Sequence, residues 1–107
     1  MVINVLGTEY NIYRKTEEED RFLEKCDGYC DKTSKKIVVR EFKDGEVEFD
    51  NLKWYLDKVL RHEIVHAFLI ESGLCENASH DDEQTVDWIA IQFPKMLKIF
   101  KELDIID

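Results

Sequence analysis

The segment His62-Glu63-Ile64-Val65-His66 combines residue types and a spacing that could carry out metal-dependent chemistry. Residues four apart lie one turn from each other on the same face of a helix. Two imidazoles at this spacing can direct their nitrogens at one Zn²⁺, about 2.0–2.1 Å away. Glu63 is rotated by about 100° from His62 around the helix, so it can accept a proton from a water on the metal. We therefore predict that His62 and His66 bind zinc and that Glu63 is the catalytic base.

The surroundings of this H-E-x-x-H pattern argue against a chance occurrence on an exposed helix. A chain of this composition would contain the pattern by accident roughly once in a hundred cases. Its polar residues also stand in the most apolar helical stretch of the chain, between Val59-Leu60 and Ala67-Phe68-Leu69-Ile70. Buried imidazoles and carboxylates are unfavourable unless they are paired or bind a metal. Metal binding is therefore the preferred interpretation.

A tetrahedral catalytic zinc site needs a third protein ligand and one open position. The candidates downstream are His80, Asp81, Asp82, Glu83 and Asp87. We favour Glu83, because the apolar residues that follow it would pack its helix against the helix that carries the two histidines. His80 is the second choice and would complete a three-histidine site, and the aspartates are less favoured still.

Asp87 follows Glu83 by four residues, so the two carboxylates face the same way on a helix. While Glu83 binds the metal, Asp87 could accept the ring N–H of a ligand histidine and thereby fix the tautomer of that ring. The alternative is that Asp87 is a solvated charge on the helix surface.

A long helix, predicted for residues 52–72, would position the two histidines and Glu63. Asp50 or Asn51 can cap its start, and Gly73 can end it. The apolar residues of this stretch cover more than a narrow stripe, as they do in a helix buried in the middle of a domain.

Two shorter helices are predicted after it. The first runs from residue 79 or 80 to about residue 92, and Phe93-Pro94 breaks or kinks it. Residues 95–103 form a last amphipathic helix. Its apolar stripe could be a dimer face, although such a stripe more commonly completes the core.

The first half of the chain is predicted to be mostly antiparallel sheet with one helix. A capping box formed by Thr16 and Glu19 predicts a helix over residues 17–26, and Asp44-Gly45 predicts a hairpin turn. The predicted strands are residues 2–6, 10–14, 29–31, 36–42 and 47–49. The fold class is therefore α+β, a small antiparallel sheet packed on a long helix plus further helices.

Length and composition limit what the chain can be. Its 107 residues predict one domain, residues 1–107. Acidic residues exceed basic ones by 24 to 15, and the net charge of −9 excludes a protein that binds nucleic-acid phosphates or an anionic membrane directly. No apolar run can span a bilayer, and the N-terminus lacks the pattern of a signal peptide. Three cysteines, an odd number, predict reduced thiols and a cytoplasmic location.

The combination of HEIVH with the later E-x-x-x-D, Glu83 and Asp87, resembles the gluzincin zinc peptidases, of which thermolysin is the familiar member. More narrowly, residues 60–69 and 83–90 are similar to the small ImmA/IrrE-like metallopeptidases of bacterial mobile elements and phages. Members of that family usually read E-x-E-A-N-x-F-A where this chain has EQTVDWIA, so Thr85 stands in place of the second glutamate.

This resemblance implies a minimal zincin-like domain and a zinc-dependent endopeptidase (a hydrolase) that cleaves a partner protein, typically a repressor. Glu83 would be the third ligand, and Asp87 would orient His62. The substrate would add as a strand to an edge strand of the sheet, expected from residues 36–42 or 47–49. Tyr29, Tyr55 and His80 are candidates to stabilise the oxyanion.

A non-catalytic alternative remains: a zinc-binding interaction module, such as an inhibitor or an anti-repressor, built on an inactive peptidase fold. The presence of Glu63 favours the enzyme, because an inactive peptidase has no use for a general base.

Overall fold

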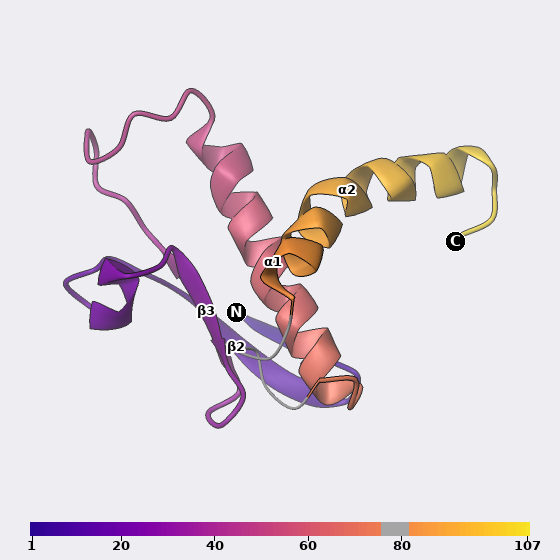
Figure 1. The fold of residues 1–107 in the computed structure, drawn as a ribbon, viewed down its shortest axis with the longest axis horizontal. Coiled ribbons are helices and arrows are strands. Elements are labelled where there is room, and N and C mark those ends of the chain that lie inside the picture. Colours follow the sequence, from indigo (N-terminus) through magenta and orange to yellow (C-terminus); the bar gives the residue numbers. More distant parts are fainter. Residues whose placement is uncertain (76–81) are drawn as a thin grey trace.

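Four strands, one short 3-10 helix and two long helices form the described part of the chain, residues 1–75 and 82–107 of the computed structural model (Figure 1). In chain order they are β1 (Val2–Val5), β2 (Thr8–Lys15), η1 (Arg21–Glu24), β3 (Gly28–Asp31), β4 (Lys36–Arg40), α1 (Leu52–Glu71) and α2 (Glu83–Glu102). The predicted α+β class is confirmed. Neither described helix is long and apolar enough to cross a membrane.

The sheet is mixed, with the strand order β1-β2-β4-β3. β1 pairs with β2, and β3 with β4, in antiparallel fashion, but β2 and β4 are parallel. The prediction of an antiparallel sheet is therefore wrong at this central pair. After β2 the chain forms β3 at the edge of the sheet, and β4 then lies between β2 and β3. Ile37, Val38 and Val39 of β4 are all fully buried, as expected for a central strand that neighbours a parallel one.

The predicted helix over residues 17–26 is wrong: only η1 forms there. The capping interaction itself is present, because the Thr16 amide donates to Glu19 Oε1 at 3.0 Å. It closes a turn, and Asp20 then caps η1 by accepting a hydrogen bond from the Phe22 amide. Leu23 is fully buried, whereas Phe22 is 70% exposed. A segment with so little apolar surface against the core gains too little from packing to hold a longer helix.

The strand predicted at residues 47–49 is also absent, since these residues have no regular structure. The turn predicted at Asp44-Gly45 does form, and Gly45 has a positive φ of 77°. Glu46 folds back, accepting hydrogen bonds from the Lys43 amide at 2.8 Å and from Arg40 Nη2 at 2.7 Å. The side chain of Glu46 thus closes a loop with Arg40 and Lys43, and no second strand of a hairpin follows the turn.

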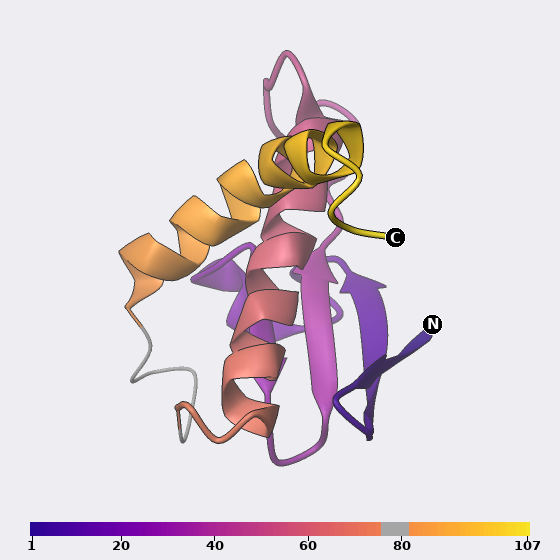
Figure 2. The same cartoon turned by 90° about the vertical axis from the view of Figure 1, so that its right-hand side faces the viewer.

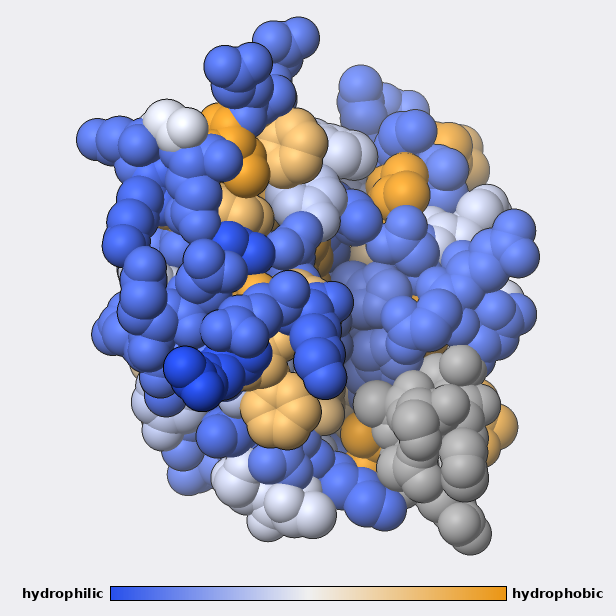
Figure 3. Space-filling view, turned by 60° about the vertical axis from the view of Figure 1, so that its left-hand side comes forward, coloured by the Kyte–Doolittle hydropathy of each residue, from blue (hydrophilic) through white to orange (hydrophobic). Residues whose placement is uncertain are grey.

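Helix α1 lies across one face of the sheet, and α2 crosses α1 on the side away from the sheet (Figure 2). The core between α1 and the sheet comprises Val5, Tyr10, Ile12, Ile37, Val39, Val59 and Ala67. The face seen in Figure 3 is largely hydrophilic, consistent with the high charge of the chain.

Gly28 lets β3 approach α1 closely. A Cβ atom at this position would lie 2.7 Å from Val59 Cγ1 and 3.2 Å from the Val38 carbonyl oxygen. Both distances are shorter than ordinary van der Waals contact, so any side chain here would push β3 away from the helix.

A partly buried polar contact connects the C-terminal end of α1 to the sheet. Glu71 Oε2 accepts hydrogen bonds from the Tyr10 hydroxyl at 2.7 Å and from Lys35 Nζ at 2.8 Å. Burial and the bond to Glu71 raise the pKa of Tyr10. The hydrogen bonds from Lys35 and Tyr10 lower the pKa of Glu71 to about 2. The ionised form of Glu71 is therefore the form that holds the helix on the sheet.

The pKa of Glu71 makes the stability of the protein depend on pH. A carboxyl whose pKa is lower in the folded chain contributes stability that is complete above its unfolded pKa and is lost as the pH falls through its folded pKa. For Glu71 this range runs from the ordinary value of 4.5 down to about 2. In urea titrations above pH 4.5, wild type should have a larger free energy of unfolding than Glu71→Gln. This difference should shrink as the pH is lowered from 4.5 to about 2. Glu18→Gln is the control, because Glu18 belongs to an exposed pair with Lys43 and should change stability little.

Candidate metal centre

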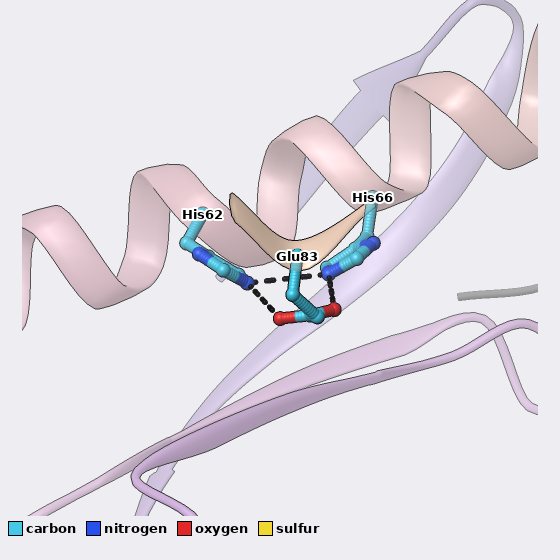
Figure 4. A group of neighbouring side chains, drawn as sticks. All are labelled: His62, His66 and Glu83. Atoms are coloured by element: carbon cyan, nitrogen blue, oxygen red, sulfur yellow. Dashed lines mark hydrogen bonds and ion pairs between the residues drawn. The ribbon is translucent and has the colours of Figure 1, made fainter. Parts of the chain in front are cut away.

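Three predicted ligands converge where α1 and α2 cross. His62 and His66 lie one turn apart on α1, and Glu83 is the first residue of α2 (Figure 4). Glu83 Oε2 is 2.9 Å from His62 Nε2, Glu83 Oε1 is 2.7 Å from His66 Nε2, and the two Nε2 atoms are 3.2 Å apart. Side-chain exposure rises from 3% for His66 and 13% for His62 to 66% for Glu83. The cluster therefore opens to solvent on the side of Glu83.

The local sequence explains why Glu83 stands at this place. Asp82 is the N-cap of α2: one carboxylate oxygen accepts hydrogen bonds from the amides of Gln84 and Thr85. The second oxygen accepts a hydrogen bond from the Thr85 hydroxyl at 2.7 Å. Asp82, a candidate ligand by its place in the sequence, thus serves as a cap. His80 and Asp81, the two candidate ligands that precede it, lie outside the described residues.

Asp87 makes the contact that was predicted for it. Its Oδ1 atom is 3.1 Å from Nδ1 of His62 and accepts a hydrogen bond from Lys58 Nζ at 3.0 Å. Burial acts to raise the pKa of Asp87, but the hydrogen bonds from Lys58 and His62 lower it below its usual value. An ionised Asp87 is an acceptor, so this contact favours the tautomer of His62 with its proton on Nδ1. In that tautomer the lone pair of Nε2 is directed at Glu83.

This arrangement provides a test of whether the residues fit a cation. With the proton on Nδ1, Nε2 of His62 and the carboxylate oxygen of Glu83 are both acceptors, and they face each other at 2.9 Å. Two acceptors at this distance repel each other unless a cation or an additional proton lies between them. Ligands of a tetrahedral zinc ion lie about 3.3 Å from one another, given metal–ligand distances of about 2.0–2.1 Å. The observed separations of 2.7–3.2 Å need to widen by about 0.1–0.6 Å, which small side-chain rotations can supply, so the donor set fits Zn²⁺.

Glu63 lies on α1 between the two histidines and is 7% exposed. Burial raises the pKa of its carboxyl, although His62 and His66 act to lower it. Glu63 lines a shallow depression of about 200 Å³ beside the cluster, and Gly28 forms part of the same wall. The depression is lined by Asp27, Gly28, Tyr55, Lys58, Val59, His62, Glu63, Glu83 and Asp87. A carboxylate with a raised pKa beside a metal site has the properties of a general base.

Lys58 is the site residue that reasoning from the sequence missed. It precedes His62 by four residues, so the spacing 58, 62, 66 could have indicated that all three side chains share one face of α1. Lys58 is only 15% exposed and shares Asp87 with His62. It also lies over the ring of Tyr55, with its Nζ atom 5.2 Å from the ring centroid.

The two tyrosines considered for the oxyanion both have acceptors. The hydroxyl of Tyr29 donates to Asp20, and that of Tyr55 donates to Asp27. Tyr55 lines the depression, whereas Tyr29 is not part of its lining. Of these two candidates, only Tyr55 is therefore placed beside the cluster.

Arg61 fixes the position of α2 against α1. Pro94 lies inside α2, which is one helix from Glu83 to Glu102, so the prediction of two separate helices on either side of Phe93-Pro94 is wrong. Pro94 has no N–H to donate to the carbonyl four residues earlier, that of Ala90. Arg61 Nε donates to this carbonyl instead, at 2.7 Å. A hydrogen bond between the helices thus replaces one that the proline removes within α2.

This replacement predicts that positions 61 and 94 are energetically coupled. Arg61→Leu should lower the free energy of unfolding by about 1–3 kcal/mol, because it removes a donor from the buried carbonyl of Ala90. In a Pro94→Ala background, Arg61→Leu should lower the free energy of unfolding by less. The backbone N–H gained at position 94 can then donate to the carbonyl of Ala90 in place of Arg61. A double-mutant cycle by urea denaturation measures the difference. Lys53→Leu, at an exposed position of α1, is the control, and equal costs of Arg61→Leu in both backgrounds would contradict the coupling.

Comparison of the chain with protein-family models, with curated proteins and with solved structures finds no match. What the chain does is therefore a question for the chemistry of the site itself.

Proposed function

We propose that this chain is a zinc-dependent endopeptidase of the gluzincin type, similar to the ImmA/IrrE-like metallopeptidases, that cleaves a partner protein in the cytoplasm. One observation carries the proposal. His62, His66 and Glu83 direct two imidazole nitrogens and a carboxylate at one point, with separations of 2.7–3.2 Å. Among the described residues the set consists of three ligands and opens to solvent on the side of Glu83, as is typical of a catalytic zinc site rather than of a structural one.

Zinc in this position would polarise the scissile carbonyl and activate a water. The protein supplies the remaining steps. Glu63, whose pKa is raised by burial, takes the proton of the attacking water and then passes it to the leaving amine. Asp87 and Lys58 keep the proton of His62 on Nδ1, so that Nε2 remains available as a ligand. Glu83 contributes the negative charge that a two-histidine site lacks.

The sheet topology corrects the predicted position of the substrate. β4 lies between β2 and β3 and is not an edge strand, and residues 47–49 form no strand. The edge of the sheet on the side of the site is β3. Gly28, the first residue of β3, lines the same depression as Glu63. A peptide that pairs with β3 would therefore pass close to Glu63. Its backbone hydrogen bonds to β3 would provide the affinity. We propose β3 as the substrate-binding edge and a repressor-like protein as the substrate.

The size of the depression is also consistent with a different function, that of a zinc-binding interaction module without catalysis. The depression beside the cluster has a volume of about 200 Å³, below the range of about 300–1,000 Å³ that is common for ligand sites. A shallow site suits an extended peptide, but it would also suit a protein that only binds its partner.

Metal analysis tests the centre itself. The purified protein should contain about one Zn²⁺ per chain after dialysis. His62→Ala and Glu83→Ala should each weaken zinc affinity by at least about tenfold, measured by competition with a chromogenic chelator. Glu102→Ala removes a carboxylate from the opposite end of α2 and should leave the affinity unchanged. Retained affinity in Glu83→Ala would remove Glu83 from the ligand set.

Glu63→Gln separates catalysis from metal binding. The variant should bind zinc as well as wild type does, yet lose cleavage by about a hundredfold or more, because the amide cannot accept the proton of the water. A protein-derived peptide library, with new termini identified by mass spectrometry, supplies the readout. If zinc-loaded wild type cleaves no more of the library than Glu63→Gln does, the interaction module replaces the enzyme.

A further inference from the structure

Residues 93–103, the C-terminal part of α2 and its C-cap, extend beyond α1 (Figure 1). Val86 and Ala90, in the first half of the helix, are buried. Further along, Phe93, Met96, Ile99 and Leu103 are 37–64% exposed. The radius of gyration of 14.8 Å exceeds the value of about 13 Å expected for a compact domain of this length. We call residues 93–103 the α2 tip.

An apolar groove lies beside the tip, between α1 and α2. Its volume is about 520 Å³, and its walls include Ile64, Val65, Phe68 and Leu69 of α1 and Ile89 and Phe93 of α2. Phe68 is 42% exposed and Phe93 is 45% exposed. A contiguous apolar surface of this kind commonly marks an interaction site.

The α2 tip has the pattern of a helix that binds in such a groove. Met96, Ile99, Phe100 and Leu103 stand at positions i, i+3, i+4 and i+7, the spacing of the anchor residues in helix-in-groove recognition. We propose that the occupant is a second copy of this chain: the α2 tip of each copy lies in the apolar groove of its partner. The contact is isologous, since groove meets tip twice about a two-fold axis, and the four helices α1 and α2 of both copies form one bundle.

A second copy is favoured because groove and tip are on the same chain. The reciprocal contact covers both uncovered surfaces at once, whereas a partner that filled only the groove would leave the tip exposed. The distribution of charge along the chain also favours a second copy. The tip carries Lys95, Lys98 and Lys101 against the single acid Glu102, while the chain as a whole has a net charge of −9. The one charged residue that lines the groove is Arg61, so the attraction is a long-range one, between the basic tip and the acidic remainder of the partner.

The size of the contact sets its expected strength. A standard interface buries about 800 Å² per partner. The exposed parts of the tip and groove side chains, together with the stems of the lysines, supply several hundred Å² per copy. This places the contact at the small end of specific interfaces, where weak and transient associations are found.

Sedimentation velocity on the full chain from about 1 to about 200 µM, a range that detects weak association, tests the proposal. Wild type should change from monomer to dimer over this range. Ile99→Asp in the tip and Phe68→Asp in the groove should each weaken the dimer by about tenfold or more. Trp54→Asp, at a 50% exposed position of α1 outside the groove, should leave it unchanged. Circular dichroism establishes that the variants are folded.

Two outcomes overturn the proposal. A wild type that stays monomeric up to the highest concentration would show that something other than a second copy covers these surfaces. A dimer that persists in folded Ile99→Asp or Phe68→Asp would show that the copies associate through another face.

Discussion

The crossing of α1 and α2 is the constraint on which the candidate centre depends, because two of its ligands belong to one helix and the third belongs to its neighbour. The buried residues of α2 are Val86 and Ala90. Polar contacts between the two helices add to their packing in fixing the alignment. Asp87 is held by Lys58 and His62 together, and the carbonyl of Ala90 is held by Arg61. Polar contacts are directional, so they set the rotation of α2 as well as its distance from α1.

The electrostatics of the centre follow from the same crossing. Glu63, Glu83 and Asp87 bring three carboxyl groups to one short stretch of the two helices. Lys58 offsets the charge of Asp87, and burial disfavours the charged form of Glu63. The remaining negative charge of Glu83 lies closest to the two imidazoles. In a chain with a net charge of −9, the local field also attracts cations to this position.

The sequence was sufficient for features that depend on local spacing. The relative positions of His62 and His66 follow from the helical period. The position of Asp87 one turn after Glu83 indicated a contact with a ligand histidine, and the resemblance to the gluzincins implied that this histidine is His62. Pairing between distant segments was harder to predict, because strand neighbours depend on the whole fold. The parallel pair β2 and β4 was missed, although the unbroken apolar run Ile37-Val38-Val39 was a signal for a central strand.

Two further predictions, the end of a helix at Phe93-Pro94 and the helix over residues 17–26, were wrong because they considered only neighbours in the sequence. A proline within a helix removes one hydrogen bond, and the rule cannot foresee that Arg61 of another helix will replace it. The capping residues Thr16 and Glu19 interact as expected, yet a cap does not by itself supply the apolar face that a helix needs. Lys58 was overlooked for a related reason: a lysine is usually a surface residue, and only its contact with Asp87 gives it a role.

The division of the ligands between two helices has a consequence for assembly. In the proposed centre, an ion bound by His62, His66 and Glu83 would be a cross-link between α1 and α2, the same two helices that form the walls of the apolar groove. Anything that fixes their crossing angle would therefore also fix the shape of the groove. By thermodynamic linkage, such a coupling is reciprocal: metal would favour the pairing of two copies, and the pairing would tighten the hold of each copy on its metal.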